Sequence, residues 1–223
     1  MSLGALVSAS GTADASFPQP TTLTVEEGLL RPATFSLTYD TDIQDGDLAP
    51  LSHSSLGPDC PVVIQVSVNN EMQTLLKGSV LRHAASLHVG GEGTLRVMGA
   101  DASSEMNREF HTKVWNDSTD AMIVQQILGQ YGFTPRTDAT SGTNSESMHS
   151  LVQRETDLQL VYRLARRNGY WFWLSADGTG TSITAHFRRP PLSETPGVPS
   201  PFALGKPMWR ISSCNGTSIA LPG

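Results

Sequence analysis

The sequence has little charge and no long hydrophobic run. Charged residues make up 16% of its 223 residues, below the roughly 25% typical of soluble domains. The formal net charge is -6 at pH 7, so the chain lacks the excess of Lys and Arg that phosphate binding requires, and we predict no nucleic-acid recognition. No apolar stretch reaches the roughly 20 residues of a membrane helix. We therefore expect no membrane insertion by this chain.

The sequence has few cysteines and no two histidines at a metal-binding spacing. Cys60 and Cys214 are the two cysteines, and they could in principle form a disulfide. A chain of this length does not need a disulfide to fold, so we expect two free thiols. Neither His-x-x-x-His nor His-Glu-x-x-His spacing occurs among the six histidines, and there is no Cys-x-x-Cys. We predict no metal site and no cofactor. The six histidines are His53, His83, His88, His111, His149 and His186.

Residue patterns for catalysis are also missing. Cys60 precedes Pro61 at the start of a predicted strand, without the basic neighbour or helix N-terminus that would activate a thiol. Glu155 and Asp157 lie close together, but at a helix start carboxylates interact with unpaired N–H groups, which we favour over glycosidase chemistry. Residues 90–93 lack the Lys-[Ser/Thr] of a phosphate loop. We predict that the chain is not an enzyme.

Strand signals dominate the first half of the sequence. Twenty glycines and fourteen prolines favour a fold rich in loops and strands. From residue 22, apolar residues alternate with polar ones, which is typical of half-buried strands. Over 21–115 the spacing predicts a small antiparallel barrel or sandwich. The predicted strands are 22–25, 34–39, 61–68, 74–82 and 94–98, with turns at Asn69-Asn70 and Gly90-Gly91.

After Trp115 the apolar period changes to that of helices. Asp117 or Ser118 can cap a first helix that runs to Tyr131, and residues 137–147 form a polar loop. Thr156 caps a second helix, and Gly169 ends it. This helix carries a cluster of Arg163, Arg166 and Arg167, which either forms a solvated face or contacts an acidic partner surface. An aromatic strand follows at 170–174 and its hairpin partner at 183–187. We therefore predict an α+β unit over 116–189 and an α+β fold class for the chain.

The two ends of the sequence carry weaker signals. Residues 1–20 are mostly small and polar, and we expect a flexible arm. The first residues also lack the basic start and apolar run of a secretory signal peptide, so we expect synthesis in the cytoplasm. Residues 190–223 predict a Pro-rich linker and a C-terminal segment with a strand near 208–211, which would start a new barrel or return to the first.

The segment from Leu151 to Leu174 resembles the signature of the phage late control protein D and VgrG-like baseplate hub families. In those families a strand ending in Gln-x-Arg-Glu-[Ser/Thr]-Asp leads into a helix with Leu-Ala near its end, then Gly and an aromatic strand. Upstream, residues 76–80 and 99–101 are similar to the family's earlier strands. The matching residues are Arg154, Glu155, Thr156, Asp157, Leu158, Leu164, Ala165 and Gly169.

The resemblance implies a structural protein of a phage tail, type VI secretion apparatus or other contractile injection system. It implies a tail-tube-like barrel over 21–115, a homotrimer, and contacts with a spike protein and with the tail tube or inner-sheath protein. Such a trimer joins the hexameric tube to the threefold spike. The chain is then expected to end up in a virion baseplate or injection particle.

Two other classes of function stay open. A free-standing β-rich module could bind a ligand or carbohydrate through Trp171 and Trp173, which strand alternation places on one face. That reading requires the face to be open to solvent. A small hydrolase is the other alternative, and the sequence shows no catalytic constellation for it.

Overall fold

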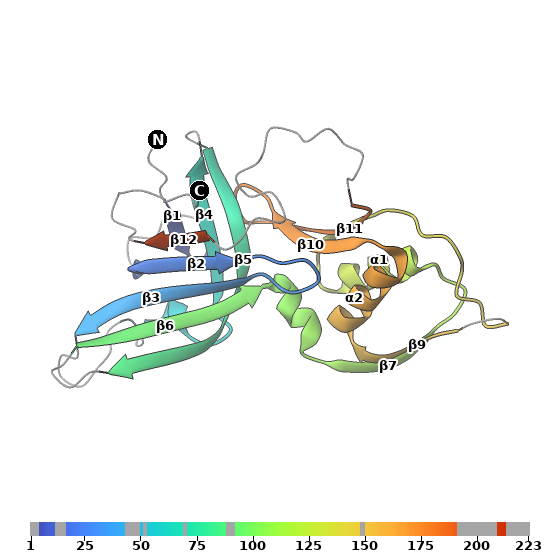
Figure 1. Cartoon of the computed structure of the whole chain (residues 1–223), viewed down its shortest axis with the longest axis horizontal. Helices are drawn as coiled ribbons and strands as arrows, with labels where there is room; N and C mark the ends of the chain where they lie inside the picture. Colours follow the sequence, from blue (N-terminus) through green and yellow to red (C-terminus); the bar gives the residue numbers. More distant parts are fainter. Residues whose placement is uncertain are drawn as a thin grey trace.

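Seven antiparallel strands form one curled sheet (Figure 1). The computed structural model describes residues 5–11, 17–42, 50, 53–68, 71–87, 92–147, 150–190 and 209–212. Across the sheet the order is β1-β4-β5-β6-β3-β2-β12. The strands are β1 (Ala5–Ser8), β2 (Thr22–Glu26), β3 (Thr34–Asp42), β4 (Pro61–Val68), β5 (Glu71–Leu87), β6 (Glu92–Asp101) and β12 (Trp209–Ser212).

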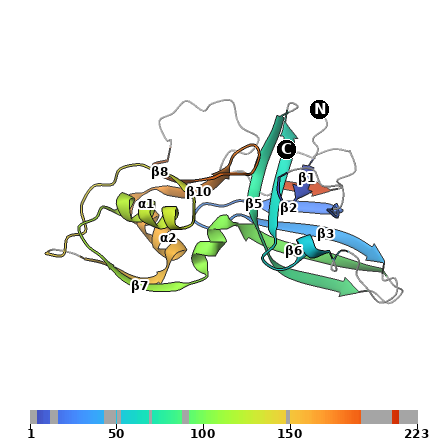
Figure 2. The ribbon, with the colours of Figure 1, turned by 180° about the vertical axis from the view of Figure 1, so that it is seen from behind.

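A second unit is inserted between β6 and β12 of this sheet. Its helices pack against a three-stranded sheet of order β10-β11-β8, as Figure 2 shows from behind, and β7 pairs with β9 in a separate two-stranded ribbon. A short 3₁₀ turn, η1 (Ser54–Leu56), precedes β4. The inserted elements are η2 (Ala102–Asn107), β7 (Phe110–Trp115), α1 (Asp120–Gln130), β8 (Thr134–Thr137), β9 (Leu151–Thr156), α2 (Asp157–Asn168), β10 (Trp171–Ala176) and β11 (Ile183–Arg188).

Each unit has its own hydrophobic core. In the sheet the alternating residues of β2, β3 and β6 face inward, among them Leu23, Leu37 and Val97, which are fully buried. The core of the inserted unit lies between α1, α2 and the sheet of β10, β11 and β8. The α+β class predicted from the two apolar periods is confirmed.

The ends of the chain differ from the prediction. The expected flexible arm contains β1, which pairs with β4 and buries Val7, and Phe17 is 2% exposed, so that prediction is wrong for these residues. Their apolar side chains complete the core of the sheet, which local composition does not reveal. The predicted C-terminal strand is present as β12 and pairs with β2, so this segment returns to the first sheet.

The inserted unit brings two further corrections. Thr119, not Asp117 or Ser118, caps α1, because its Oγ1 accepts the N–H of Met122 at 3.3 Å and Asp117 has a positive φ of 52°. The sequence also did not reveal β8, which pairs in parallel with β11. The predicted turns at 69–70 and 90–91 and most of the Pro-rich linker lie outside the described residues.

Strand β5 bends the sheet. Its first half, residues 71–79, pairs with β4, whereas residues 78–87 pair with β6, and a bulge lies between Val80 and Arg82. Two glycines allow β5 and β6 to approach each other closely. A side chain at Gly78 would overlap the carbonyl oxygen of Ala100, and one at Gly99 would overlap that of Ser79 and the Phe35 ring. The backbones of β5 and β6 therefore lie too close together at these two positions for a side chain. The bulge between Val80 and Arg82 bends β5, as bulges of this kind bend a strand.

The turn between β10 and β11 connects the two units. The carbonyl oxygen of Gly178 accepts hydrogen bonds from Gln65 Nε2 at 2.8 Å and from Thr74 Oγ1 at 3.2 Å, and Lys77 Nζ donates to the carbonyl of Thr181 at 3.0 Å. Asp177 orders the turn by accepting the N–H of Thr181 at 2.7 Å. Gln65 is 3% exposed, so the docked turn covers the face of β4 that points away from the core.

Replacing Gly78 or Gly99 with Ala is expected to reduce the free energy of unfolding by about 2 kcal/mol or more, because each new Cβ meets backbone that cannot move aside. Chemical denaturation measures the change. Gly129→Ala is the matched control, since nothing lies within 4 Å of a Cβ there. In the last turn of α1 it should leave stability unchanged or raise it by no more than about 1 kcal/mol. Equal changes in the free energy of unfolding at the three positions would contradict this close approach of β5 and β6.

Candidate assembly interface

The segment that resembles the hub signature forms β9, α2 and β10. Thr156 caps α2: its Oγ1 accepts the N–H of Gln159 at 3.3 Å, and Gln159 Oε1 accepts the N–H of Thr156 at 3.2 Å. Gly169 ends the helix with a φ of 67°, a conformation that glycine adopts without strain. Both predicted helix limits are confirmed.

The apolar signature residues belong to the core of the inserted unit. Leu158 is 2% exposed, and Leu164 and Ala165 are fully buried. They lie on the face of α2 that packs against β10, where Tyr162 meets Phe172 edge to face with ring centroids 5.7 Å apart. Phe172 of the aromatic strand is therefore a core residue, and it is also 2% exposed.

Asp157 has a different role from the one predicted. Its carboxylate, 5% exposed, accepts hydrogen bonds from Gln153 Nε2 at 2.7 Å and from Tyr131 Oη at 2.9 Å. Gln153 in turn accepts from Trp115 Nε1 at 3.0 Å. Burial, and then the bond to Asp157, raises the pKa of Tyr131, so its phenol stays a donor. The network joins β7, β9 and the end of α1 to α2, which no local sequence signal predicts.

The charged signature residues take two separate roles. Glu155 lies on β9 rather than in the helix and pairs with Arg163, whose Nη2 is 2.6 Å from Glu155 Oε1. Arg163 Nη2 also donates to the carbonyl of Val152 at 3.2 Å. Arg154 is exposed on the outer face of the ribbon. The prediction that Glu155 interacts with the helix N-terminus is therefore wrong, because β9 continues through Thr156.

The arginine cluster of α2 is only partly a solvated face. Arg167 binds the buried carboxylate of Asp120, with its Nε 2.8 Å from Oδ2, and Asn168 Nδ2 donates to the same oxygen at 2.7 Å. Asn144 Nδ2 donates to the other oxygen at 3.1 Å. Asp120 is 3% exposed, so this group ties the start of α1 to the end of α2. Arg166 and Arg167 are both exposed, and among the described residues Arg166 is the one of the three cations that forms no ion pair.

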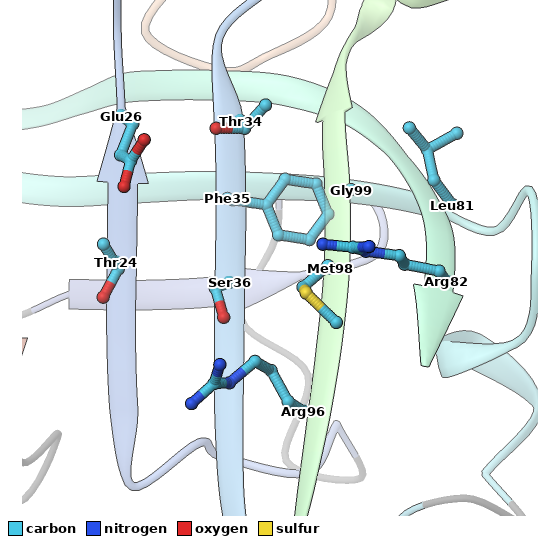
Figure 3. Close-up of a pocket in the computed structure, with 10 residues that line it drawn as sticks. All are labelled: Thr24, Glu26, Thr34, Phe35, Ser36, Leu81, Arg82, Arg96, Met98 and Gly99. Atoms are coloured by element: carbon cyan, nitrogen blue, oxygen red, sulfur yellow. The ribbon is translucent and has the colours of Figure 1, made fainter. Parts of the chain in front are cut away.

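A hollow of about 360 Å³ lies on the outer face of the sheet, over β2, β3, β6 and β5 (Figure 3). Gly99 lies in its floor beside the ring of Phe35, which is itself 2% exposed and belongs to the core of the sheet. Arg82 and Arg96 are exposed, and in Figure 3 their guanidinium groups reach back over β6 and β3. The hollow is lined by Thr24, Glu26, Thr34, Phe35, Ser36, Leu81, Arg82, Arg96, Met98 and Gly99.

The second half of β5 is an exposed edge strand. The pairing of β4 with β5 stops at Pro61 and Ser79, and among the described residues the turn at 54–60 lies beyond it, with His83 Nε2 2.6 Å from the carbonyl oxygen of Leu56. Over residues 84–87 the described chain pairs β5 with β6 alone. Leu81 and Leu87 are 48% and 58% exposed. An uncovered edge with apolar side chains is a surface that favours contact with another chain.

The ribbon of β7 and β9 presents a second apolar surface. Phe110 is 66% exposed, Val114 54% and Val152 44%. Val114 and Val152 are directly opposite each other in the pairing, so they form one patch on the outer face. The inner face of the ribbon carries Trp115 and Gln153 and packs on the helices. Exposed aromatic and branched side chains at adjacent positions are typical of interfaces.

Trp171 and Trp173 do not form an open platform. Both are half-buried, and Trp173 stacks on His186 with ring centroids 4.5 Å apart and an interplanar angle of 4°. Burial, followed by the nearby Arg136 and Arg188, lowers the pKa of His186, so the stacked ring is neutral at pH 7. One face of Trp173 is thus already occupied within the chain.

Within the described residues, no group of three His, Cys, Asp or Glu side chains is arranged to hold a metal ion. Cys60 is a free thiol whose Sγ donates to the carbonyl of Ser54 at 3.1 Å. Cys214 lies outside the described residues. Among the helices that the structure describes, none is both long and apolar enough to cross a bilayer.

The fold matches those of tail proteins. The 43 kDa tail protein of prophage MuSo2 from Shewanella oneidensis has a TM-score of 0.56 at 17% identity, over 84% of this chain and 53% of that one. An Escherichia coli component of the type VI secretion system has 0.61 at 17%, over 86% and 51%. A Neisseria meningitidis tail protein has 0.59 at 11%, over 88% and 53%. This chain spans about half the length of each.

The fold is thus that of phage tail and type VI secretion structural proteins. The model of the phage tail baseplate hub (GPD) family matches residues 26–199, which include most of the sheet and the whole inserted unit. The chain belongs to this family, and the resemblance drawn from residues 151–174 is confirmed. No curated protein matches the sequence.

Asp157→Asn is expected to reduce the free energy of unfolding by about 2 kcal/mol, because its new amide group faces the donors of Gln153 and Tyr131 in a buried site. Thermal or chemical denaturation measures this. Asp117→Asn, the same change at an exposed position, should shift stability by no more than about 0.5 kcal/mol. If Asp157→Asn is as mild as the control, the network does not join the inserted unit together.

Proposed function

We propose that the chain is a subunit of a homotrimeric baseplate hub that joins a hexameric tail tube to a spike protein. The observation that carries this proposal is the family match over residues 26–199, which includes most of the curled sheet and the whole inserted unit. The chain is accordingly assigned to a structural part of a phage tail or related injection particle. Its partners are then further copies of itself, the spike, and the tube or inner-sheath protein.

The curled sheet suits a part that adapts one symmetry to another. A ring that meets a hexameric tube needs sheet surfaces that repeat about the axis, and a threefold spike needs three equivalent contacts. The exposed edge of β5 and the apolar ribbon of β7 and β9 are surfaces available for such contacts. The similar solved proteins are about twice as long as this chain.

A role in binding rather than catalysis fits the polar groups of the described chain. The most buried carboxylates, those of Asp101, Asp120 and Asp157, each accept hydrogen bonds within the fold. Burial raises the pKa of Asp101, although hydrogen bonds from Ser103 and Ala33 oppose the shift. Carboxylates held in this way have hydrogen-bond partners inside the fold. We infer that the chain is not an enzyme.

The test is the solution mass of the purified chain by light scattering, alone and with candidate spike and tube proteins. A mass of three copies, reached alone or when the spike is added, is the expected result. The tube protein should co-elute with the trimer and not with the monomer. A chain that stays monomeric and binds neither protein would contradict the proposal and leave an isolated binding module as the better account.

A further inference from the structure

The loop between β2 and β3, residues 27–33, joins the curled sheet to the inserted unit. In Figure 1 it extends from the sheet toward that unit. Leu30 packs against the core of the inserted unit, and the N–H of Ala33 donates to Oδ2 of Asp101 at 2.8 Å, where η2 begins. We propose that this loop is a latch between the two units, which closes when the carboxylate pair of Glu27 and Asp101 takes up a proton. The latch belongs to the single chain, so it operates whether or not the chain forms a trimer.

The backbone of the latch is strained at Leu30. Its φ is 54°, in the left-handed region that residues with a side chain seldom adopt. Such a conformation persists only where contacts with the surrounding structure offset its cost. The contacts here are the packing of Leu30 on the inserted unit and the hydrogen bond from Ala33 to Asp101. A small change in either contact is therefore enough to favour release of the loop.

A cleft of about 260 Å³ lies beside the latch, between β5 of the sheet and β10 of the inserted unit. Glu27, Ala33 and Asp101 line it, and they also line a smaller hollow of about 30 Å³. Residues of the latch and of both units thus form the walls of one cleft. A movement of the latch changes how the two units are held together.

Two carboxylates in this cleft have no counter-ion. Asp101 is 8% exposed, whereas Glu27 is exposed, and neither takes part in an ion pair among the described residues. Asp101 is fixed in place, because it accepts the N–H of Ala33 and both the N–H and the hydroxyl of Ser103. Two negative charges in a poorly hydrated site each make ionisation of the other less favourable.

The two cations that line the cleft bind carbonyl groups instead of these carboxylates. Arg31 Nη2 donates to the carbonyl of Glu27 at 3.4 Å, and Lys77 Nζ donates to the carbonyl of Thr181 at 3.0 Å. The residues that β10 contributes carry no titratable group. They are Trp173, Leu174, Ser175 and Ala176.

The helices add one more acidic group. Burial, followed by the charge of Asp101, raises the pKa of Tyr162 on α2, so its phenol stays neutral, and the nearby Arg166 opposes this shift. On η2, Glu105 and Arg108 are exposed and lie outside the lining of the cleft. The charge that changes in this cleft near neutral pH is therefore that of the carboxylate pair.

Both carboxyl groups hold a proton more strongly than isolated ones. Loss of hydration in the cleft, followed by the charge of Asp101, raises the pKa of Glu27 above its ordinary value of 4.5. Burial raises the pKa of Asp101 above 3.8, although its hydrogen bonds oppose the shift. The folded chain thus binds more protons than the unfolded one. This contribution to stability is complete below the ordinary pKa values and is lost as the pH rises through the raised ones.

A single proton on Glu27 is enough to close the latch. It removes the repulsion between the two carboxylates, while Asp101 keeps accepting the hydrogen bonds of Ala33 and Ser103. When the pair is fully ionised, two charges without a counter-ion act against the strained contact of Leu30.

The experiment is native-state hydrogen exchange of the full chain, followed by NMR from about pH 4 to about pH 8 and expressed as protection factors. The protection of the Ala33 amide should fall about fivefold or more over this range, because one unit of pKa shift corresponds to a tenfold change in an equilibrium. The amide of Tyr170, which donates to the carbonyl of Ala165 within the inserted unit, should keep its protection.

Three variants separate the proton from the latch. Glu27→Gln removes the titrating carboxyl at an exposed position and should keep Ala33 protected over the whole range. Glu26→Gln is the matched control, since Glu26 lines the hollow on the outer face of the sheet, and the fall in protection should persist. Leu30→Ala should lower the protection of Ala33 about tenfold at every pH, because it removes apolar contact with the inserted unit.

A carbon-13 NMR titration of the Glu27 carboxyl in the unaltered chain gives an independent readout. A pKa above 4.5 is expected, and a pKa at or below this value would overturn the role of the carboxylate pair. Protection of Ala33 that does not change with pH, or that changes equally in Glu27→Gln, would overturn the sensitivity to protons. Full protection of Ala33 in Leu30→Ala would overturn the latch itself.

Discussion

The close approach of β5 and β6 at two glycines is the constraint on which the rest of the structure depends. Gly78 pairs with Val62 on one side and Asp101 on the other, so it is the residue where the two halves of the sheet meet. With no side chain at Gly78 or Gly99, the backbones approach closely and the bulge after Val80 turns β5 away from β4. The bend closes the core on one side and leaves the second half of β5 as an exposed edge.

The inserted unit is held on this bent sheet by hydrogen bonds, some of them partly buried. Gln65 and Thr74 hold the Gly178 carbonyl, while Asp101 accepts the N–H of Ala33 at 2.8 Å and so fixes the start of η2 to the loop before β3. Such contacts favour one arrangement of the two units, because burying a polar group without its hydrogen-bond partner costs more free energy than burying an apolar group. The orientation of the β7 and β9 ribbon relative to the sheet is set in this way.

Local signals were enough to predict much of this fold. The caps at Thr156 and Gly169, the strand at 61–68 and the hairpin after α2 follow from residue types and spacing within a few positions. What escaped prediction depends on contacts distant in sequence: the pairing of β1 with β4, the parallel pairing of β8, and the carboxylate of Asp157 receiving Gln153 and Tyr131. The exposure of Phe110 and Leu87 was likewise hidden, because it is decided by which strands lie beside them.

The central claim is that this chain repeats three times about the axis of an injection particle. The most direct measurement is an electron cryomicroscopy reconstruction, without imposed symmetry, of the complex of this chain with its spike and tube proteins. The account predicts three copies around one axis between tube and spike, with the curled sheets in contact with the tube. One or six copies, or sheets that contact neither the tube nor a neighbouring copy, would contradict it.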